Sequence, residues 1–172
     1  MKSSELVIIV AVLALGVGLT TRFFIEPAQS KALTPLSEFN LPDAAGKQHD
    51  SKEWQGKIRI INFWATWCSP CRKEIPEFIT LQEKYADKNV QFIGIAIDEA
   101  PEVSEYLKTI PINYPMLIGS DTGMALAQRW GNNIGAVPYT IVVDQQGQIV
   151  HQQAGEFSTE QIVKVITPLI SN

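Results

Sequence analysis

Phe63-Trp64-Ala65-Thr66-Trp67-Cys68-Ser69-Pro70-Cys71 decides the fold, and it contains both cysteines of the 172-residue chain. An apolar run from Ile58 to Trp64 leads into this stretch, and a helical pattern from Arg72 to Asp87 leads out of it. The pattern predicts a buried strand that delivers a Cys-x-x-Cys pair to the first turn of a helix. Pro70 fits there, because a proline in the first helical turn loses no hydrogen bond.

The predicted position of the cysteine pair favours thiolate chemistry. Unpaired N–H groups and the positive end of the helix dipole stabilise an anion at a helix N-terminus. A thiol at that position has a lowered pKa and attacks a disulfide more readily. We therefore expect Cys68 to be the attacking thiolate and Cys71 to be the resolving partner that closes the disulfide.

Two other roles for the cysteine pair fit the sequence less well. A structural zinc site needs four ligands, but the only histidines are His49 and His151, which lie about a hundred residues apart. We expect both histidines at the surface. A disulfide across a two-residue gap removes little loop entropy, so it stabilises a fold poorly. The pair therefore indicates a redox site, and we expect no metal and no cofactor other than the pair itself.

The stretch from Asn62 to Glu77 resembles the active site of thioredoxin-fold proteins, in particular the TlpA-like branch with its ResA and CcmG relatives. The resemblance rests on Trp67-Cys68-Ser69-Pro70-Cys71 and on Arg72-Lys73-Glu74-Ile75-Pro76-Glu77, and it extends from about Leu36 to the C-terminus. It implies an α/β thioredoxin-like fold, in which helices flank a central mixed sheet. It also implies that the protein is a thiol–disulfide oxidoreductase.

A second segment carries the same resemblance. Gly135-Ala136-Val137-Pro138-Tyr139-Thr140 is similar to the loop that holds the family's cis-proline beside the cysteines. The resemblance implies a cis bond before Pro138, and it implies that the backbone around Val137 and Pro138 pairs with an incoming peptide. Trp67 is expected to lie beside Cys68 on the same docking surface.

Glu74 is the third candidate catalytic residue. It lies one helical turn beyond Cys71, so its side chain can point back towards the pair, and the resemblance implies a role in proton handling. A partly buried carboxylate with a raised pKa could take the proton of Cys71 as the mixed disulfide resolves. Classical thioredoxins have a buried Asp where this chain has Asn62, which leaves Glu74 as the nearby acid. The alternative is a solvated helix residue beside Arg72 and Lys73.

The beginning of the chain differs in composition from the rest. Leu6 to Leu19 carries no charged or polar side chain, and residues 6–25 would span about 30 Å as a helix, which matches a bilayer core. We expect residues 1–25 to be an uncleaved membrane anchor, 26–35 a tether and 36–172 the folded domain. A cleaved signal peptide is the alternative. The resemblance implies a bacterial inner-membrane protein whose catalytic domain lies on the periplasmic side.

The rest of the sequence predicts the order of elements found in a thioredoxin fold. Residues 36–47 resemble an N-terminal hairpin that this branch shares with peroxiredoxins. Helices are predicted from about residue 69 to 87 and at 101–109, 122–130 and 159–170, and strands at 58–63, 90–97, 115–118, 139–143 and 148–153. Residues 101–118 form a central insert in this scheme.

The predicted reaction is thiol–disulfide exchange with protein disulfides or dithiols. The resemblance implies a reductase in an oxidising compartment, which receives electrons from a transmembrane thiol reductant. Keeping the haem-attachment cysteines of apocytochromes c reduced is one such role. The net charge of −4 is spread without blocks, so nothing indicates binding to nucleic acid.

Two other classes of function remain as alternatives. A peroxiredoxin-like thiol peroxidase would share the N-terminal hairpin. However, peroxiredoxins place their reactive cysteine in a Thr-x-x-Cys turn, whereas Thr66 lies only two residues before Cys68, and Trp67 fills the space that a peroxide pocket needs. A non-catalytic tethered chaperone or binding module would tolerate the loss of both thiols, which an oxidoreductase would not.

Overall fold

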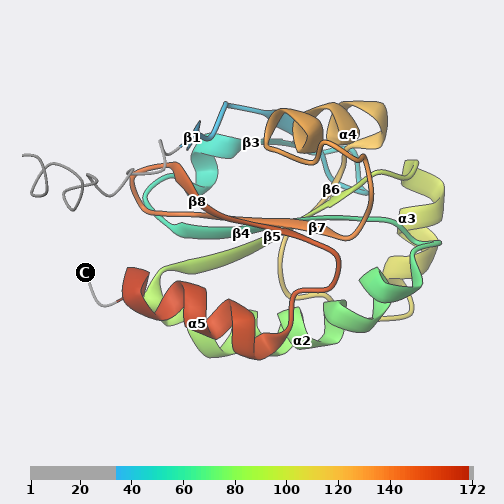
Figure 1. Ribbon diagram of the computed structural model, residues 1–172. Coiled ribbons are helices and arrows are strands. Elements are labelled where there is room, and N and C mark those ends of the chain that lie inside the picture. The colour runs from blue at the N-terminus through green and yellow to red at the C-terminus, as the bar shows by residue number, and fades with distance from the viewer. Residues whose placement is uncertain (1–33, 171–172) are drawn as a thin grey trace, which may run out of the picture. The chain divides into compact units, whose positions relative to one another are not determined.

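The computed structural model describes residues 34–170, and a six-stranded mixed sheet runs through the middle of this part of the chain (Figure 1). The α-helices and the five strands predicted between residues 58 and 153 begin and end within two residues of their expected positions. The strands outside the N-terminal hairpin are β1 (Thr34–Pro35), β4 (Ile58–Trp64), β5 (Val90–Ala96), β6 (Met116–Ile118), β7 (Tyr139–Val143) and β8 (Gln148–Ala154). The α-helices are α2 (Ser69–Tyr85), α3 (Ala100–Leu107), α4 (Ser120–Arg129) and α5 (Thr159–Ile170).

The strands of the large sheet lie in the order β1-β8-β7-β4-β5-β6. β4 pairs in parallel with β5 and antiparallel with β7, so the strand that precedes the cysteines lies inside the sheet. β1 pairs with β8 through Thr34 and Pro35, which lie opposite Ile149 and Gln148. We expected the folded domain to start at Leu36. The sheet begins two residues earlier, at Thr34.

Helices cover both faces of the sheet, with α2 and α5 on one face and α4 on the other (Figure 1). β4 contributes to both cores because successive side chains of a strand point to opposite faces. Ile60 and Trp64 belong to the core that includes residues of α2 and α5. Ile61 and Phe63 belong to the core that includes Trp130, at the end of α4. The mainly apolar stretch before the cysteines is therefore that of a strand buried on both sides.

The predicted hairpin and the predicted insert are both present, although the hairpin extends past the predicted residues 36–47, as far as Asp50. β2 (Asn40–Pro42) and β3 (Gln48–Asp50) pair antiparallel as a separate two-stranded sheet, and a 3₁₀ turn, η1 (Ser51–Trp54), follows them. A second 3₁₀ turn, η2 (Ala86–Lys88), follows α2. The insert supplies α3 and β6, and β6 extends the large sheet in parallel with β5.

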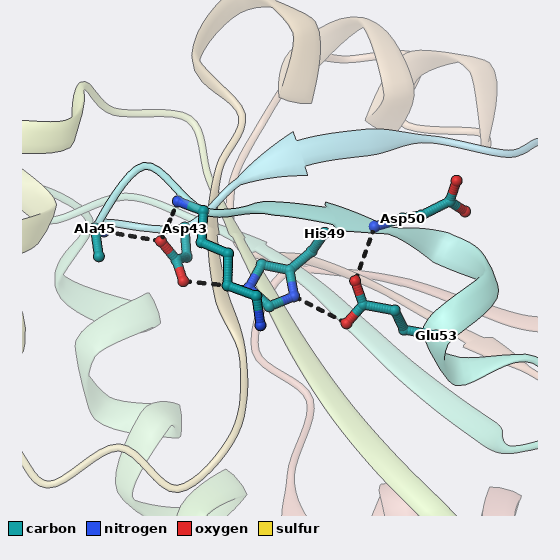
Figure 2. A network of polar contacts seen from close by, with 6 residues as sticks. Asp43, Ala45, His49, Asp50 and Glu53 are labelled. Atoms are coloured by element: carbon teal, nitrogen blue, oxygen red, sulfur yellow. Dashed lines mark hydrogen bonds and ion pairs between the residues drawn. The ribbon is translucent and has the colours of Figure 1, made fainter.

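Both histidines are less exposed than the sequence led us to expect, so this part of the interpretation was wrong. The side chain of His49 is 13% exposed and lies between two carboxylates (Figure 2). Its Nδ1 is 3.0 Å from Oε2 of Glu53, and its Nε2 is 3.2 Å from Oδ2 of Asp43. His151 is half-buried and stacks on Phe157, with the ring centroids 5.1 Å apart.

The expected anchor at residues 1–25 lies outside the described residues, as does most of the expected tether. Between residues 34 and 170, no helix has both the length and the apolar character needed to cross a membrane.

Candidate active site

The two cysteines form a disulfide at the N-terminus of α2. Cys68 is the N-cap residue, and its Sγ accepts a hydrogen bond of 3.2 Å from the backbone N–H of Cys71. Pro70 lies in the first turn of the helix, as predicted. Cys68 is 4% exposed, whereas Cys71 is fully buried. Of the two sulfur-bearing residues, Cys68 is therefore the one that presents surface to a partner.

Glu74 is buried on α2, with only 4% of its surface exposed. Its Oε1 accepts a hydrogen bond of 2.8 Å from the side-chain amide of Asn62, and its Oε2 accepts one of 3.2 Å from the backbone N–H of Phe157. Burial raises the pKa of Glu74 to about 7; the two hydrogen bonds oppose this rise, and the charges of Glu156 and Glu77 add to it. A carboxyl with this pKa can accept and release a proton near neutral pH. The alternative of a solvated helix residue is therefore wrong.

Asn62 connects Glu74 to the central strands. Besides its bond to Glu74, its amide nitrogen donates a hydrogen bond of 3.0 Å to Oγ1 of Thr140 on β7. Asn62 and Thr140 are both buried. Thr140 lies two residues after Pro138, so hydrogen bonds join the acid on α2 to the strand that follows the proline loop.

The proline loop has the backbone conformation that the resemblance implied. The peptide bond between Val137 and Pro138 is cis. Pro138 is buried, and its carbonyl oxygen accepts a hydrogen bond of 2.9 Å from the N–H of Gly155. The loop is also held from its other end, where the side-chain amide of Asn132 donates a hydrogen bond of 2.8 Å to the carbonyl oxygen of Ala136. Val137 is half-buried.

Trp67 points into solvent beside the cysteine pair, and 67% of its surface is exposed. Its indole N–H donates a hydrogen bond of 2.8 Å to Oδ1 of Asp98, while the backbone N–H of Thr66 donates to Oδ2 of the same carboxylate. Asp98 follows β5, at a kind of position where a charged side chain is commonly solvated. Its carboxylate instead holds the segment that leads into Cys68. Trp64, by contrast, is fully buried in the core.

Ile134 was missed by the sequence interpretation. Within residues 34–170, Trp67 and Ile134 are the two large hydrophobic residues that remain exposed, and Ile134 is 78% exposed. Ile134 lies four residues before Pro138, so the exposed apolar side chains belong to the two segments that carry the cysteines and the cis-proline. Asn132, Asn133 and Gly135, which lie beside Ile134 in the sequence, are residue types that are common in turns. This composition could have indicated that Ile134 lies in a loop.

The chain is similar to known proteins over most of its length. It matches the Redoxin family over residues 29–166. It is 33% identical over 177 residues to the thiol-disulfide oxidoreductase ResA of Bacillus thuringiensis (strain Al Hakam). This similarity covers 98% of this chain and all of that protein. It is also 35% identical over 117 residues to the thiol:disulfide interchange protein HelX of Rhodobacter capsulatus. That similarity covers 67% of this chain and 62% of HelX.

Solved structures agree with these sequence similarities. The crystal structure of a thiol:disulfide interchange protein of the thioredoxin family from Chlorobium tepidum superposes with a TM-score of 0.73 at 29% sequence identity. The superposition covers 82% of this chain and 99% of that one. The thioredoxin-like fold expected from sequence is therefore confirmed.

Proposed function

Because the chain belongs to the redoxin family and is a thiol–disulfide oxidoreductase, we propose that it acts on protein disulfides through Cys68 and Cys71. One observation carries the proposal: the two cysteines form a disulfide at the N-terminus of α2, with Cys68 still 4% exposed and Cys71 fully buried. This arrangement suits an exchange in which one sulfur meets the partner and the other resolves the intermediate.

The reaction transfers two electrons from the reduced pair to the partner. The Cys68 thiolate attacks one sulfur of the partner's disulfide, which forms a mixed disulfide and releases the first partner thiolate. Cys71, once deprotonated, attacks Sγ of Cys68 and releases the second partner thiolate. The pair is left as the disulfide seen in the structure. The Cys71 N–H and the helix dipole stabilise negative charge on Cys68 before the attack.

We assign the proton transfer to Glu74. Its carboxylate takes the proton of Cys71 when the resolving step begins and afterwards releases it to solvent, from which the two released partner thiolates take up protons. The supporting observations are its place one turn after Cys71, its burial, and the pKa of about 7 that burial produces.

The docking surface consists of Trp67, Val137 and Pro138. The exposure of Trp67 supports this assignment, because a large apolar side chain held in solvent is typical of a site that meets another protein. The backbone around Val137 and Pro138 would pair with an extended segment of the partner, as a strand added to a sheet edge does.

We further propose that the protein works as a reductase outside the cytoplasm, tethered to the membrane by its N-terminal segment. The apolar composition of residues 6–25 supports an anchor. Electrons would come from a transmembrane thiol reductant. Apocytochrome c, with its pair of haem-attachment cysteines, is the partner that the family resemblance favours.

The test compares the full chain with a Cys68→Ser, Cys71→Ser double variant. The substrates are insulin and an oxidised peptide that contains the haem-attachment motif Cys-x-x-Cys-His, and dithiothreitol supplies the electrons. The wild type should accelerate reduction of both disulfides, and the double variant should not. Equal activity of the two proteins would mean that the chain is a binding module whose thiols are dispensable.

A further inference from the structure

A crevice of about 230 Å³ opens beside Glu74, between α2 and the loop that joins β8 to α5. Residues from α2, from this loop and from the start of α5 line it: Lys73, Glu74, Glu77, Glu156, Phe157, Ser158 and Gln161. The side chains of Lys73 and Glu156 are 71% and 57% exposed, whereas Glu74 is 4% exposed. The crevice therefore leads from solvent to a buried carboxyl.

The two oxygens of Glu74 have different surroundings. Oε1 is bonded to Asn62, which belongs to the central strand β4, and Oε2 is bonded to the backbone N–H of Phe157 in the wall of the crevice. The carboxyl therefore lies between the interior of the sheet and the crevice. A proton on Oε2 is on the side from which water can reach it.

The proposed reaction needs such a route. Cys71 is fully buried, and while the mixed disulfide exists the partner covers Cys68. A proton taken from Cys71 at that moment cannot leave past Cys68. The crevice lies on another side of Glu74, because its lining includes neither cysteine.

We propose that this crevice is the route by which Glu74 exchanges its proton with solvent, and that Glu156 is the acceptor at its mouth. The inference rests on the proposed role of Glu74. The proton of the Cys71 S–H passes to the Glu74 carboxylate, then from the Glu74 O–H through water in the crevice to the Glu156 carboxylate and to bulk water. No electron moves in these steps.

Glu156 suits this role better than the second acid of the crevice. Oε2 of Glu77 accepts hydrogen bonds of 2.6 Å from the hydroxyl and 3.3 Å from the backbone N–H of Thr159, at the start of α5. Glu77 is therefore held in place as part of the helix start. Glu156 is exposed and its ion pair with Lys73 is long, at 3.9 Å, so its carboxylate can rotate between the crevice and solvent.

Other ionisable groups face the same region. Lys73 and Glu77 lie on α2, and His151 on β8 stacks on Phe157. Tyr114, between α3 and β6, is influenced by the charge of Glu74, but burial raises its pKa so far that it stays protonated. The test must therefore hold pH constant and vary the concentration of a proton acceptor, so that none of these groups changes its charge.

The experiment measures the resolving step in the reduced full chain, as release of the second thiol from a fluorescent disulfide substrate. Imidazole concentration is varied at constant pH and ionic strength. Glu156→Gln should slow this step about tenfold at low imidazole, and imidazole should restore the wild-type rate by replacing the lost acceptor. The matched control, Glu83→Gln, removes an exposed acid of α2 outside the crevice and should behave like the wild type at every imidazole concentration.

The outcomes separate the route from the role of Glu74. A wild-type rate for Glu156→Gln at low imidazole, or a slow rate that imidazole does not restore, would overturn the route. Glu74→Gln is measured alongside, and it should be slow by about 100-fold or more. If Glu74→Gln resolves at the wild-type rate, the proposed role of Glu74 fails, and the route fails with it. A slow Glu74→Gln beside a normal Glu156→Gln rejects the route alone.

Discussion

The side-chain amide of Asn62 donates a hydrogen bond of 2.8 Å to Oε1 of Glu74, across the space between β4 and α2. Hydrogen bonds donated to a carboxylate favour its charged form. This contact therefore restrains the rise in pKa that burial imposes on Glu74. Classical thioredoxins place a buried acid on the strand at this position; in this chain the strand supplies the donor and the helix supplies the acid.

Replacing Asn62 should shift the titration of Glu74. Asn62→Leu keeps a similar volume but removes the donor, so the pKa of Glu74 should rise above its value of about 7. The loss of hydrogen bonds to two buried partners should also reduce stability by about 1–3 kcal/mol. A titration of the ¹³C-labelled Glu74 carboxyl by NMR measures the shift. A pKa that stays the same or falls would show that the bond does not control Glu74.

Burial of Glu74 should make the stability of the protein depend on pH. Its pKa is raised from the ordinary 4.5 to about 7, so the folded state binds this proton more tightly than the unfolded state. The stabilisation is fully present below pH 4.5 and is lost as pH rises through 7. A pKa difference of this size corresponds to about 3 kcal/mol.

Glu74→Gln should remove this dependence. Between pH 4 and pH 8, the free energy of unfolding of the oxidised wild type should fall by about 3 kcal/mol more than that of the variant. Urea denaturation at the two pH values measures the difference, and the titration of His49 is common to both proteins and cancels. Parallel pH dependence in the two proteins would contradict the buried, high-pKa assignment.

Replacing Asp98 should impair the reduction of protein disulfides more than the reduction of small disulfides. Asp98→Ala removes the carboxylate that accepts hydrogen bonds from Trp67 and Thr66, so the indole loses its fixed orientation. We expect KM for a protein disulfide to rise about tenfold, as the loss of one charged hydrogen bond of about 1.5 kcal/mol would produce. The rate with a small aromatic disulfide should be unchanged. Glu99→Ala, which removes the neighbouring exposed acid, is the control; equal effects of the two variants would refute a specific role.

His49 should titrate above its ordinary range. Its hydrogen bonds with Glu53 and then Asp43 raise its pKa above 6.5. The stabilisation from the charged ring is therefore full below pH 6.5 and is lost as pH rises through the folded-state pKa. Proton NMR of the ring gives that pKa, and amide exchange in β2 and β3 should report a weaker hairpin at high pH. His49→Gln should abolish the pH dependence of the exchange, and a ring pKa at or below 6.5 would rule out the effect.

The sequence allowed the fold around the cysteines to be predicted because the pattern there is local. The mainly apolar sequence of β4, which barely alternates, favours a strand buried on both faces, and Pro70 beside Cys71 marks the first turn of a helix. Ser158 is a comparable case: Ser158 and Gln161 have the spacing of a capping box, and the backbone N–H of each residue donates to the side chain of the other.

The parts that could not be predicted depend on contacts between distant residues. Asp98 reaches Trp67 from the end of another strand, 31 positions along the chain. Phe157 bonds to Glu74 across 83 positions. A single sequence carries no pattern that pairs such residues, and a charged residue after a strand has the same appearance whether it is solvated or holds a catalytic loop. His49 was misjudged for a different reason: its acidic partners are only four and six positions away, but they meet its ring only once the hairpin and the turn η1 have formed.

Trapping of the mixed disulfide tests the central claim most directly, namely that Cys68 meets the partner and Cys71 resolves the intermediate. Reduced full-length Cys71→Ala and Cys68→Ala variants are each mixed with an oxidised protein substrate, and covalent adducts are measured by mass spectrometry before and after reduction. Cys71→Ala should accumulate an adduct on Cys68 that a reductant removes, and Cys68→Ala, whose remaining cysteine is buried, should form none. An adduct on Cys71 of the Cys68→Ala variant, with none on Cys68 of the other, would contradict the account.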